Sequence, residues 1–177
     1  MKMIICISGL AGSGKNTVGE IVAKKLNLKE VKLSFKDEAE EEGVELMKVQ
    51  RKADQNESYD RKLDREIARR AKKGDCVVMT WLGPWMVKNA NLRVWLNVSE
   101  KERARRVAKR DGMILKKALA HIRKRDRDNI RRYKKYYGID ICDHSIFDLE
   151  INSDIFNPQQ IAGIVLKAAE AKRASRR

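Results

Sequence analysis

Three glycines and a lysine near the start of the chain have the types and spacing of an anion-binding loop. Residues 9–17 read GLAGSGKNT, with glycines at positions 9, 12 and 14 and the lysine at position 15. Glycine has no Cβ, so the backbone can adopt positive φ and close around a phosphate, while the lysine adds a mobile positive charge. The spacing matches the Walker A pattern G-x-x-x-x-G-K and predicts phosphate binding; an ordinary glycine turn is the less specific alternative. The predicted nucleotide-binding residues are those of the whole loop: Gly9, Leu10, Ala11, Gly12, Ser13, Gly14, Lys15, Asn16 and Thr17.

The loop departs from the Walker A pattern at one position. Asn16 stands where a Ser or Thr hydroxyl normally binds Mg²⁺, and Thr17 follows one residue later. We therefore expect Mg²⁺ to be held mainly by phosphates and water, with Thr17 as the candidate protein ligand.

A strand and a helix must position such a loop. Residues 3–7 are apolar and mostly β-branched, as in a buried strand, and Val18, Ile21, Val22 and Leu26 recur at helical spacing. The loop would then lead into a helix N-terminus, where free N–H groups and the helix dipole favour an anion.

The rest of the chain alternates strand-like and helical segments. Strands are expected at residues 30–34, 76–81, 92–98 and 145–151. Helices are expected at residues 36–54, 59–73, 99–109, about 113–135 and 158–169, two of them capped by Ser99 and Asn157. This order predicts an α/β fold of the P-loop NTPase type, with a five-stranded, mostly parallel sheet and helices on both faces. A single domain over residues 1–177 is expected.

The charge of the chain points to an anionic partner. The net charge is +15 and the pI is about 9.9, which favours a nucleotide, nucleic acid or a membrane surface. Residues 101–135 hold most of the excess, with 16 Lys or Arg against 4 Asp or Glu. Residues 37–45 are instead acidic and are expected to face solvent.

Neither a membrane span nor a signal-peptide pattern is visible, so we expect a cytoplasmic protein without a membrane partner. Cys6, Cys76 and Cys142 are isolated and lack metal-ligand spacing. Buried, reduced thiols are therefore expected.

Four segments together resemble the archaeal-type cytidylate kinases, a branch of the P-loop nucleoside monophosphate kinases. They are the loop, DRKLDR at 60–65, WMVKNA at 85–90, and RYKKYYGID at 132–140 followed by Asp143, Ser145 and Asp148. The resemblance covers nearly the whole chain. It implies ATP on the loop, an acceptor monophosphate held by the helices after the second strand, and an arginine-rich helical lid at about residues 100–135. CMP or dCMP is the favoured acceptor, with AMP and UMP left open.

The resemblance also implies which residues are catalytic. Phosphoryl transfer requires positive groups around the transferred phosphate and the exclusion of water. Lys15 would supply one such charge, and the lid arginines would supply the others; a solvated helix arginine is the alternative for each. These arginines are Arg103, Arg106, Arg110, Arg125 and Arg132.

The chain departs from the family on the acceptor side. Lys36 stands where the family has a phosphate-binding arginine, and residues 79–81 read Met-Thr-Trp where it has Glu-Gly-Arg. A lysine cannot reproduce the bidentate geometry of a guanidinium, and a carboxylate that would help hold Mg²⁺-bound water is missing. The candidate acceptor-binding residues are Lys36, Arg61, Asp64 and Trp81, although Trp81 could also be a core aromatic.

Two other functions stay open at this level. One is an adenylate-kinase-like P-loop ATPase that acts in RNA or ribosome assembly, which the altered acceptor side and the basic segment would fit. The other is a kinase of a small non-nucleotide acceptor. Nucleic acid is a secondary candidate partner, and the oligomeric state is left open.

Overall fold

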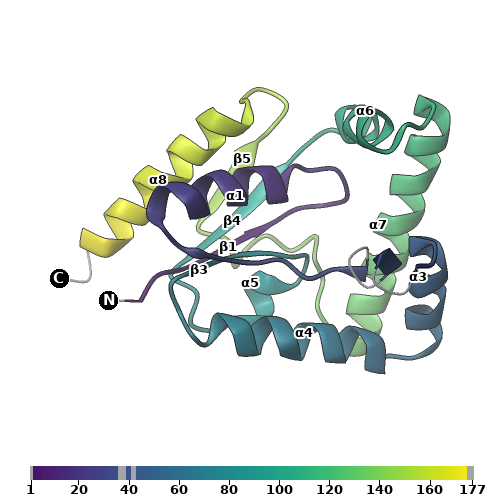
Figure 1. Cartoon of the computed structure of the whole chain (residues 1–177), viewed down its shortest axis with the longest axis horizontal. Helices are drawn as coiled ribbons and strands as arrows, with labels where there is room; N and C mark the ends of the chain where they lie inside the picture. Colours follow the sequence, from purple (N-terminus) through teal and green to yellow (C-terminus); the bar gives the residue numbers. More distant parts are fainter. Residues whose placement is uncertain (1, 36–38, 41–42, 175–177) are drawn as a thin grey trace.

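A computed structural model describes residues 2–35, 39–40 and 43–174 of the chain. At its centre lies a five-stranded sheet in the order β2-β3-β1-β4-β5 (Figure 1). Every adjacent pair of strands is parallel, which confirms the predicted α/β sheet. The strands are β1 (Ile4–Ser8), β2 (Lys29–Val31), β3 (Cys76–Met79), β4 (Leu92–Asn97) and β5 (Leu149–Asn152).

Helices cover both faces of the sheet. In Figure 1, α1 (Lys15–Leu26) and α8 (Pro158–Ala174) lie on one face, and α4 (Ser58–Ala71) and α5 (Gly83–Met86) lie on the other. The remaining helices, α3 (Leu46–Gln55), α6 (Glu100–Asp111) and α7 (Leu115–Tyr137), lie beyond the carboxyl ends of the strands. The predicted caps are present, since Ser99 Oγ accepts from Glu102 N and Asn157 Oδ1 accepts from Gln160 N. None of the described helices is long and apolar enough to cross a bilayer.

The apolar strands are buried between the two helix layers. All five residues of β1 are buried; Ile5 and Ile7 pack with Val22 of α1 and Ile161 of α8. Ile4 and Cys6 face α4 on the opposite side. Full burial of each isoleucine side chain contributes about 1.5–3 kcal/mol to folding, so β1 is held firmly at the point where the phosphate loop begins.

Some predicted boundaries are wrong for local reasons. The last strand begins at Leu149, because Ser145 N donates to Asp143 Oδ1 and Phe147 N donates to His144 O, so the chain turns there. The helix predicted at 36–54 is interrupted: residues 39–40 are helical, the chain turns at Gly43, and α3 begins at Leu46. Residues 36–38 and 41–42 lie outside the described residues, including Lys36 and much of the acidic stretch.

The thiols only partly follow the prediction. Cys6 and Cys76 are buried in the sheet, whereas Cys142 is exposed. All three are free thiols. The prediction of burial is therefore wrong for Cys142, which lies in the turn-rich segment before β5 rather than in a strand.

Candidate active site

The phosphate loop connects β1 to the first turn of α1. Gly9, Gly12 and Gly14 all have positive φ, as predicted. A Cβ on Gly12, where φ is 79°, would lie 2.8 Å from the carbonyl oxygen of Arg103, so only glycine fits there. Gly14 is the N-cap of α1, and no side chain caps this helix end within the described part of the chain. The first N–H groups of α1 are therefore available to an anion.

A buried ion pair holds the loop from behind. Asp126 Oδ1 accepts from Ala11 N at 3.3 Å, and Arg103 Nη1 donates to Ala11 O at 3.0 Å. Arg103 Nη1 also lies 2.6 Å from Asp126 Oδ2, and Arg103 is only 5% exposed. Both backbone polar groups of Ala11 are thus bound to side chains of α6 and α7. Arg103 supports the loop in this structure, and its predicted contact with a phosphate stays a prediction.

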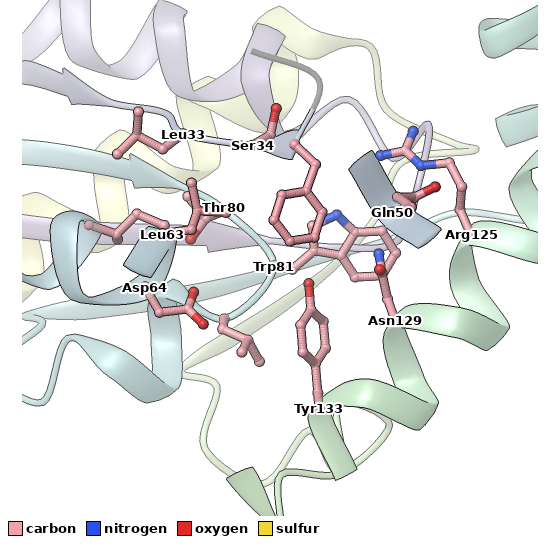
Figure 2. A pocket seen from close by; sticks show the side chains of 13 residues that line it. Leu33, Ser34, Gln50, Leu63, Asp64, Thr80, Trp81, Arg125, Asn129 and Tyr133 are labelled. Carbon is pink, nitrogen blue, oxygen red and sulfur yellow. The ribbon is translucent and has the colours of Figure 1, made fainter. Parts of the chain in front are cut away.

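Three neighbouring pockets lie at or near the loop. The phosphate-loop pocket is lined by residues 11–17 together with Trp81, Arg110 and Arg125. The inner pocket shares Trp81 and Arg125 with it and continues to Asp64 and Tyr133 (Figure 2). The rim pocket lies on the other side of the loop; it shares Thr17 and Arg110 and continues to Phe156. The loop therefore borders two of three neighbouring pockets, and the third adjoins the phosphate-loop pocket at Trp81 and Arg125.

Lys15 and Trp81 meet in the phosphate-loop pocket. Lys15 Nζ lies 5.4 Å from the centroid of the Trp81 indole, and the Trp81 carbonyl accepts a hydrogen bond from Ser8 Oγ at 2.7 Å. Desolvation, followed by the nearby charges of Arg125 and Arg110, lowers the pKa of Lys15 to about 7. A bound anion would relieve this repulsion and favour the charged ammonium.

Arg125 lies where the phosphate-loop pocket meets the inner pocket. Its Nε is buried and has no hydrogen-bond partner in the described residues. Burial and the charge of Arg110 lower the pKa of Arg125. A buried guanidinium nitrogen without a hydrogen-bond partner is energetically unfavourable. An anion bound where the two pockets meet would pair with this group.

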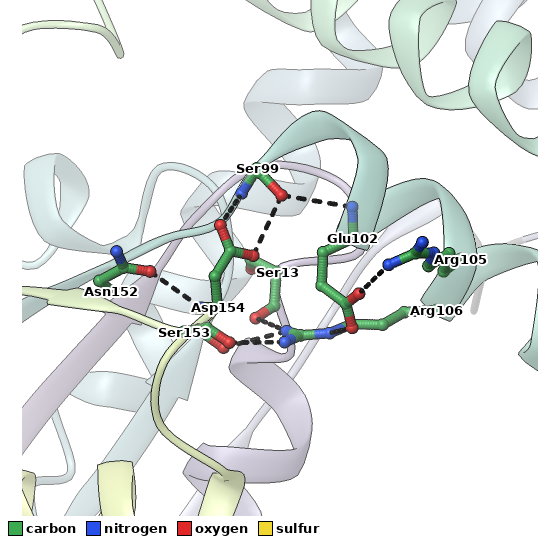
Figure 3. Close-up of polar contacts among 8 residues, drawn as sticks. All are labelled: Ser13, Ser99, Glu102, Arg105, Arg106, Asn152, Ser153 and Asp154. Atoms are coloured by element: carbon green, nitrogen blue, oxygen red, sulfur yellow. Dashed lines mark hydrogen bonds and ion pairs between the residues drawn. The ribbon is translucent and has the colours of Figure 1, made fainter.

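Arg106 connects the loop to the segment that follows β5 (Figure 3). Its Nη1 donates to Ser13 O at 3.2 Å and to Ser153 Oγ at 3.0 Å, while Nη2 donates to Ser153 O at 2.6 Å. The rim pocket next to it contains Phe156, which is 38% exposed. An exposed aromatic beside the loop suits the apolar face of a nucleotide base. Sequence reasoning missed Ser153 and Phe156, although an aromatic directly before the Asn157 cap was a visible signal.

Arg132 lies in a cage of polar groups. It is 1% exposed, its Nη1 lies 3.0 Å from Asp54 Oδ1, and its Nε lies 3.2 Å from Asp60 Oδ2. Its Nη2 donates to Asn129 Oδ1 at 2.6 Å. These contacts join α3, α4 and α7, and Arg132 does not line any of the three pockets. Its predicted contact with a phosphate stays a prediction.

The predicted acceptor residues separate into two groups. Asp64 and Trp81 line the inner pocket (Figure 2), whereas Arg61 is exposed and donates to Glu57 and to the Tyr136 carbonyl. Lys36 lies outside the described residues.

The inner pocket also contains polar residues that sequence reasoning missed. The clearest is Gln50, which is 2% exposed and has an Oε1 without a hydrogen-bond partner in the described part of the chain. An amide on the apolar face of α3 was the available signal.

Comparisons with known proteins agree with this geometry. The profile of the cytidylate kinase-like family matches residues 4–155. The chain is 42% identical to the cytidylate kinase of Sulfurisphaera tokodaii over 167 residues, covering 92% of this chain and 93% of the other. It is 41% identical to the cytidylate kinase of Pyrococcus horikoshii over 171 residues, covering 96% and 89%.

A solved structure supports the fold. Shikimate kinase from Bacteroides thetaiotaomicron superimposes with a TM-score of 0.61 at 20% identity, covering 97% of this chain and 98% of that one. The similarity to this structure establishes the fold alone, whereas the family profile and the two closely similar sequences establish the family. The chain belongs to the cytidylate kinase-like family and is an enzyme of the nucleoside monophosphate kinase class.

Proposed function

We propose that the enzyme transfers the γ-phosphoryl group of ATP to CMP or dCMP, giving ADP and the nucleoside diphosphate. The observation that carries the proposal is the position of Arg125, whose buried, unpartnered Nε lies where the loop pocket meets the inner pocket. A group that contacts both the donor and the acceptor phosphate must occupy such a boundary. Cytidine as the acceptor nucleoside is supported by the names of the two relatives.

The three pockets suit the parts of the two substrates. The ATP base would lie in the rim pocket against Phe156, its phosphates on the loop, and the acceptor in the inner pocket. An oxygen of the acceptor phosphate then attacks the γ-phosphorus, and the bond to ADP breaks. Lys15, Arg110 and Arg125 would surround the transferred group and stabilise its charge in the transition state, which is the main contribution a protein makes to this reaction.

The arginine-bearing helices α6 and α7, at about residues 100–135, would act as a lid over the bound phosphates. Arg110 lines both the loop pocket and the rim pocket from α6, and Arg125 lines the inner side from α7. Movement of these helices toward bound phosphates would exclude water from the transfer region. The whole of residues 1–177 would then work as one P-loop kinase domain.

Mg²⁺ is the proposed metal. Within the described residues no group of three or more His, Cys, Asp or Glu side chains could form a metal site. Thr17 lines both the loop pocket and the rim pocket, where the phosphates of ATP would be, whereas Asn16 lines the loop pocket only. This donor set fits Mg²⁺, which commonly retains water and binds through substrate phosphates with few protein ligands.

Replacement of Thr17 by alanine should raise the Mg²⁺ concentration needed for half-maximal activity by about tenfold. Asn16→Ala should change it little, because the amide borders only one of the pockets. A titration of kcat with Mg²⁺ at saturating nucleotide measures both variants. A larger shift in Asn16→Ala would make the asparagine amide the protein ligand instead.

A panel of acceptors tests the proposed function directly. ADP and diphosphate formation would be measured with CMP, dCMP, UMP, AMP and GMP, with ATP alone as the control. The expected result is fastest turnover with CMP or dCMP and one diphosphate formed for each ADP. If no monophosphate is phosphorylated while ATP hydrolysis increases with added RNA, the enzyme is an RNA-associated ATPase and the proposal is wrong.

A further inference from the structure

One carboxylate lies at the end of the inner pocket that is remote from the phosphate loop. Asp64 is 9% exposed and is the only Asp or Glu lining this pocket among the described residues. Apolar side chains share this part of the lining, including Leu63 and Ile67 of the same helix. In Figure 2 the carboxyl group of Asp64 points toward the pocket interior. A ligand that reaches this end of the pocket would lie against this group.

One of the two oxygens of the Asp64 carboxyl group already has a hydrogen-bond partner. Asp64 Oδ2 accepts a hydrogen bond from the Tyr137 hydroxyl at 2.6 Å, which fixes the orientation of the carboxyl group. Oδ1 accepts no hydrogen bond from the described part of the chain. This oxygen therefore has acceptor capacity left for a hydrogen-bond donor on a ligand in the pocket.

The orientation of the acceptor decides which part of it meets Asp64. The acceptor phosphate would lie near Arg125, which is the only Lys or Arg lining this pocket among the described residues and which also lines the phosphate-loop pocket. The base then extends to the opposite, mostly apolar end. Cytosine carries an exocyclic amino group at C4, which donates hydrogen bonds, whereas uracil carries a carbonyl oxygen at the same position, which only accepts them.

We propose that Asp64 is the residue that selects the acceptor base, accepting a hydrogen bond from the amino group of cytosine and rejecting the carbonyl of uracil. This inference rests on the proposed function, since it assumes a pyrimidine monophosphate in the inner pocket. Rejection follows because the ionised carboxylate and the uracil carbonyl are both acceptors, and their approach leaves two buried acceptors unpaired.

The surroundings of Asp64 make the selection sensitive to pH. Burial raises the pKa of Asp64 to about 7, the charge of Asp60 on α4 adds to the rise, and the Tyr137 hydrogen bond and Arg132 on α7 oppose it. Tyr133 and Arg125 of α7 also line the pocket with it. Above pH 7 the carboxylate is ionised and accepts from cytosine. Below pH 7 the protonated carboxyl can donate to the uracil carbonyl, so discrimination between CMP and UMP should increase as the pH rises through 7.

The test compares kcat/KM for CMP and for UMP at several pH values between 6 and 8. For the unmodified enzyme, the ratio of the two should be larger at pH 8 than at pH 6. In Asp64→Asn, whose amide can either donate or accept, the ratio at pH 8 should fall by about tenfold to a hundredfold and lose its pH dependence. A purely structural role for Asp64 would instead lower kcat/KM for both acceptors equally.

Two tyrosine variants keep the proposal testable even if Asp64→Asn folds poorly. Tyr137→Phe removes the hydrogen bond that favours the ionised carboxylate. The midpoint, which is the pH at which the ratio of kcat/KM for CMP to that for UMP is halfway through its change, should therefore be higher than in the unmodified enzyme. Tyr136→Phe is the matched control, because its hydroxyl donates to the carbonyls of Ala53 and Asp54 instead. Its midpoint should stay unchanged.

The outcomes separate this inference from the proposed function. If the enzyme phosphorylates CMP but Asp64→Asn keeps the full CMP preference, or Tyr137→Phe leaves the midpoint in place, Asp64 does not select the base. If the unmodified enzyme phosphorylates no monophosphate at all, the proposed function is wrong and the inference is lost with it.

Discussion

Replacement of Lys15 by methionine is expected to lower kcat for phosphoryl transfer by about 10³ while the protein still folds. The ammonium belongs to a residue of the phosphate loop, forms no ion pair among the described residues, and lies over the Trp81 ring. Methionine keeps an unbranched stem against the indole but cannot stabilise charge that develops on the transferred group. The loss should therefore fall on kcat more than on the stability of the fold.

The measurement is steady-state turnover with saturating ATP and CMP, accompanied by thermal unfolding. Lys24→Met is the matched control, because Lys24 lies in the last turn of the same helix and is exposed. It should retain full activity. Turnover of Lys15→Met within tenfold of the unmodified enzyme would contradict the assignment of the loop as the site of phosphoryl transfer.

The lowered pKa of Lys15 predicts that the enzyme takes up a proton when ATP binds. Its pKa is about 7 in the free enzyme, and bound phosphates should return it toward its ordinary value near 10.4. At a pH between these two pKa values, Lys15 is largely neutral in the free enzyme and charged in the ATP complex. ATP binding at pH 8 should therefore take up nearly one proton, whereas binding at pH 6 should take up almost none. Calorimetry in buffers of different ionisation enthalpy measures this number, and Lys15→Met should remove the uptake at pH 8.

Replacement of Arg103 by methionine is expected to destabilise the fold by about 3–5 kcal/mol, because it leaves the buried Asp126 carboxylate without its counter-charge. The loop peptide at Ala11 would also lose the donor to its carbonyl oxygen, so the affinity for ATP should fall as well. Denaturant unfolding measures the first effect, and ATP titration measures the second.

Arg123→Met is the control for this variant. Arg123 also joins α7 to α6, through Glu100, but both side chains of that pair are largely exposed. Solvent screens such a pair, so its loss should have little effect on stability. The double variant Arg103→Met/Asp126→Leu should recover part of the stability lost in the single variant, because no buried charge is then left unpaired. Equal stability losses in Arg103→Met and Arg123→Met would show that burial of the first pair has no consequence.

Much of the fold could be predicted from the order of the residues. Residues 3–26 contain a buried strand, a glycine loop and an amphipathic helix in immediate succession, and each is recognisable from its own pattern. The parallel sheet follows from the alternation of strands and helices. The predicted boundaries were wrong where local side chains compete with the pattern, as at Asp143, which turns the chain before β5.

The roles of the basic residues could not be predicted in the same way. Arg103 and Arg125 both lie on positively charged helices, but one forms a buried ion pair behind the loop while the other lines two pockets with an unpartnered nitrogen. Helical periodicity shows which residues share a face; it does not show what that face packs against. Arg132 was predicted with the same lid group, yet its acidic partners come from α3 and α4, more than 70 residues earlier in the chain.

By itself the sequence determined the phosphate loop, because the positive φ of its glycines and the free N–H groups of the following helix are properties of adjacent residues. It also determined the class of sheet and the family. Only the tertiary structure decided which cations line the pockets, and it placed Asp64 and Gln50 in one pocket from two different helices. The physical reason is that the burial and pairing of a charge depend on residues distant in sequence, and these set the free energy of each charge only after the helices have packed.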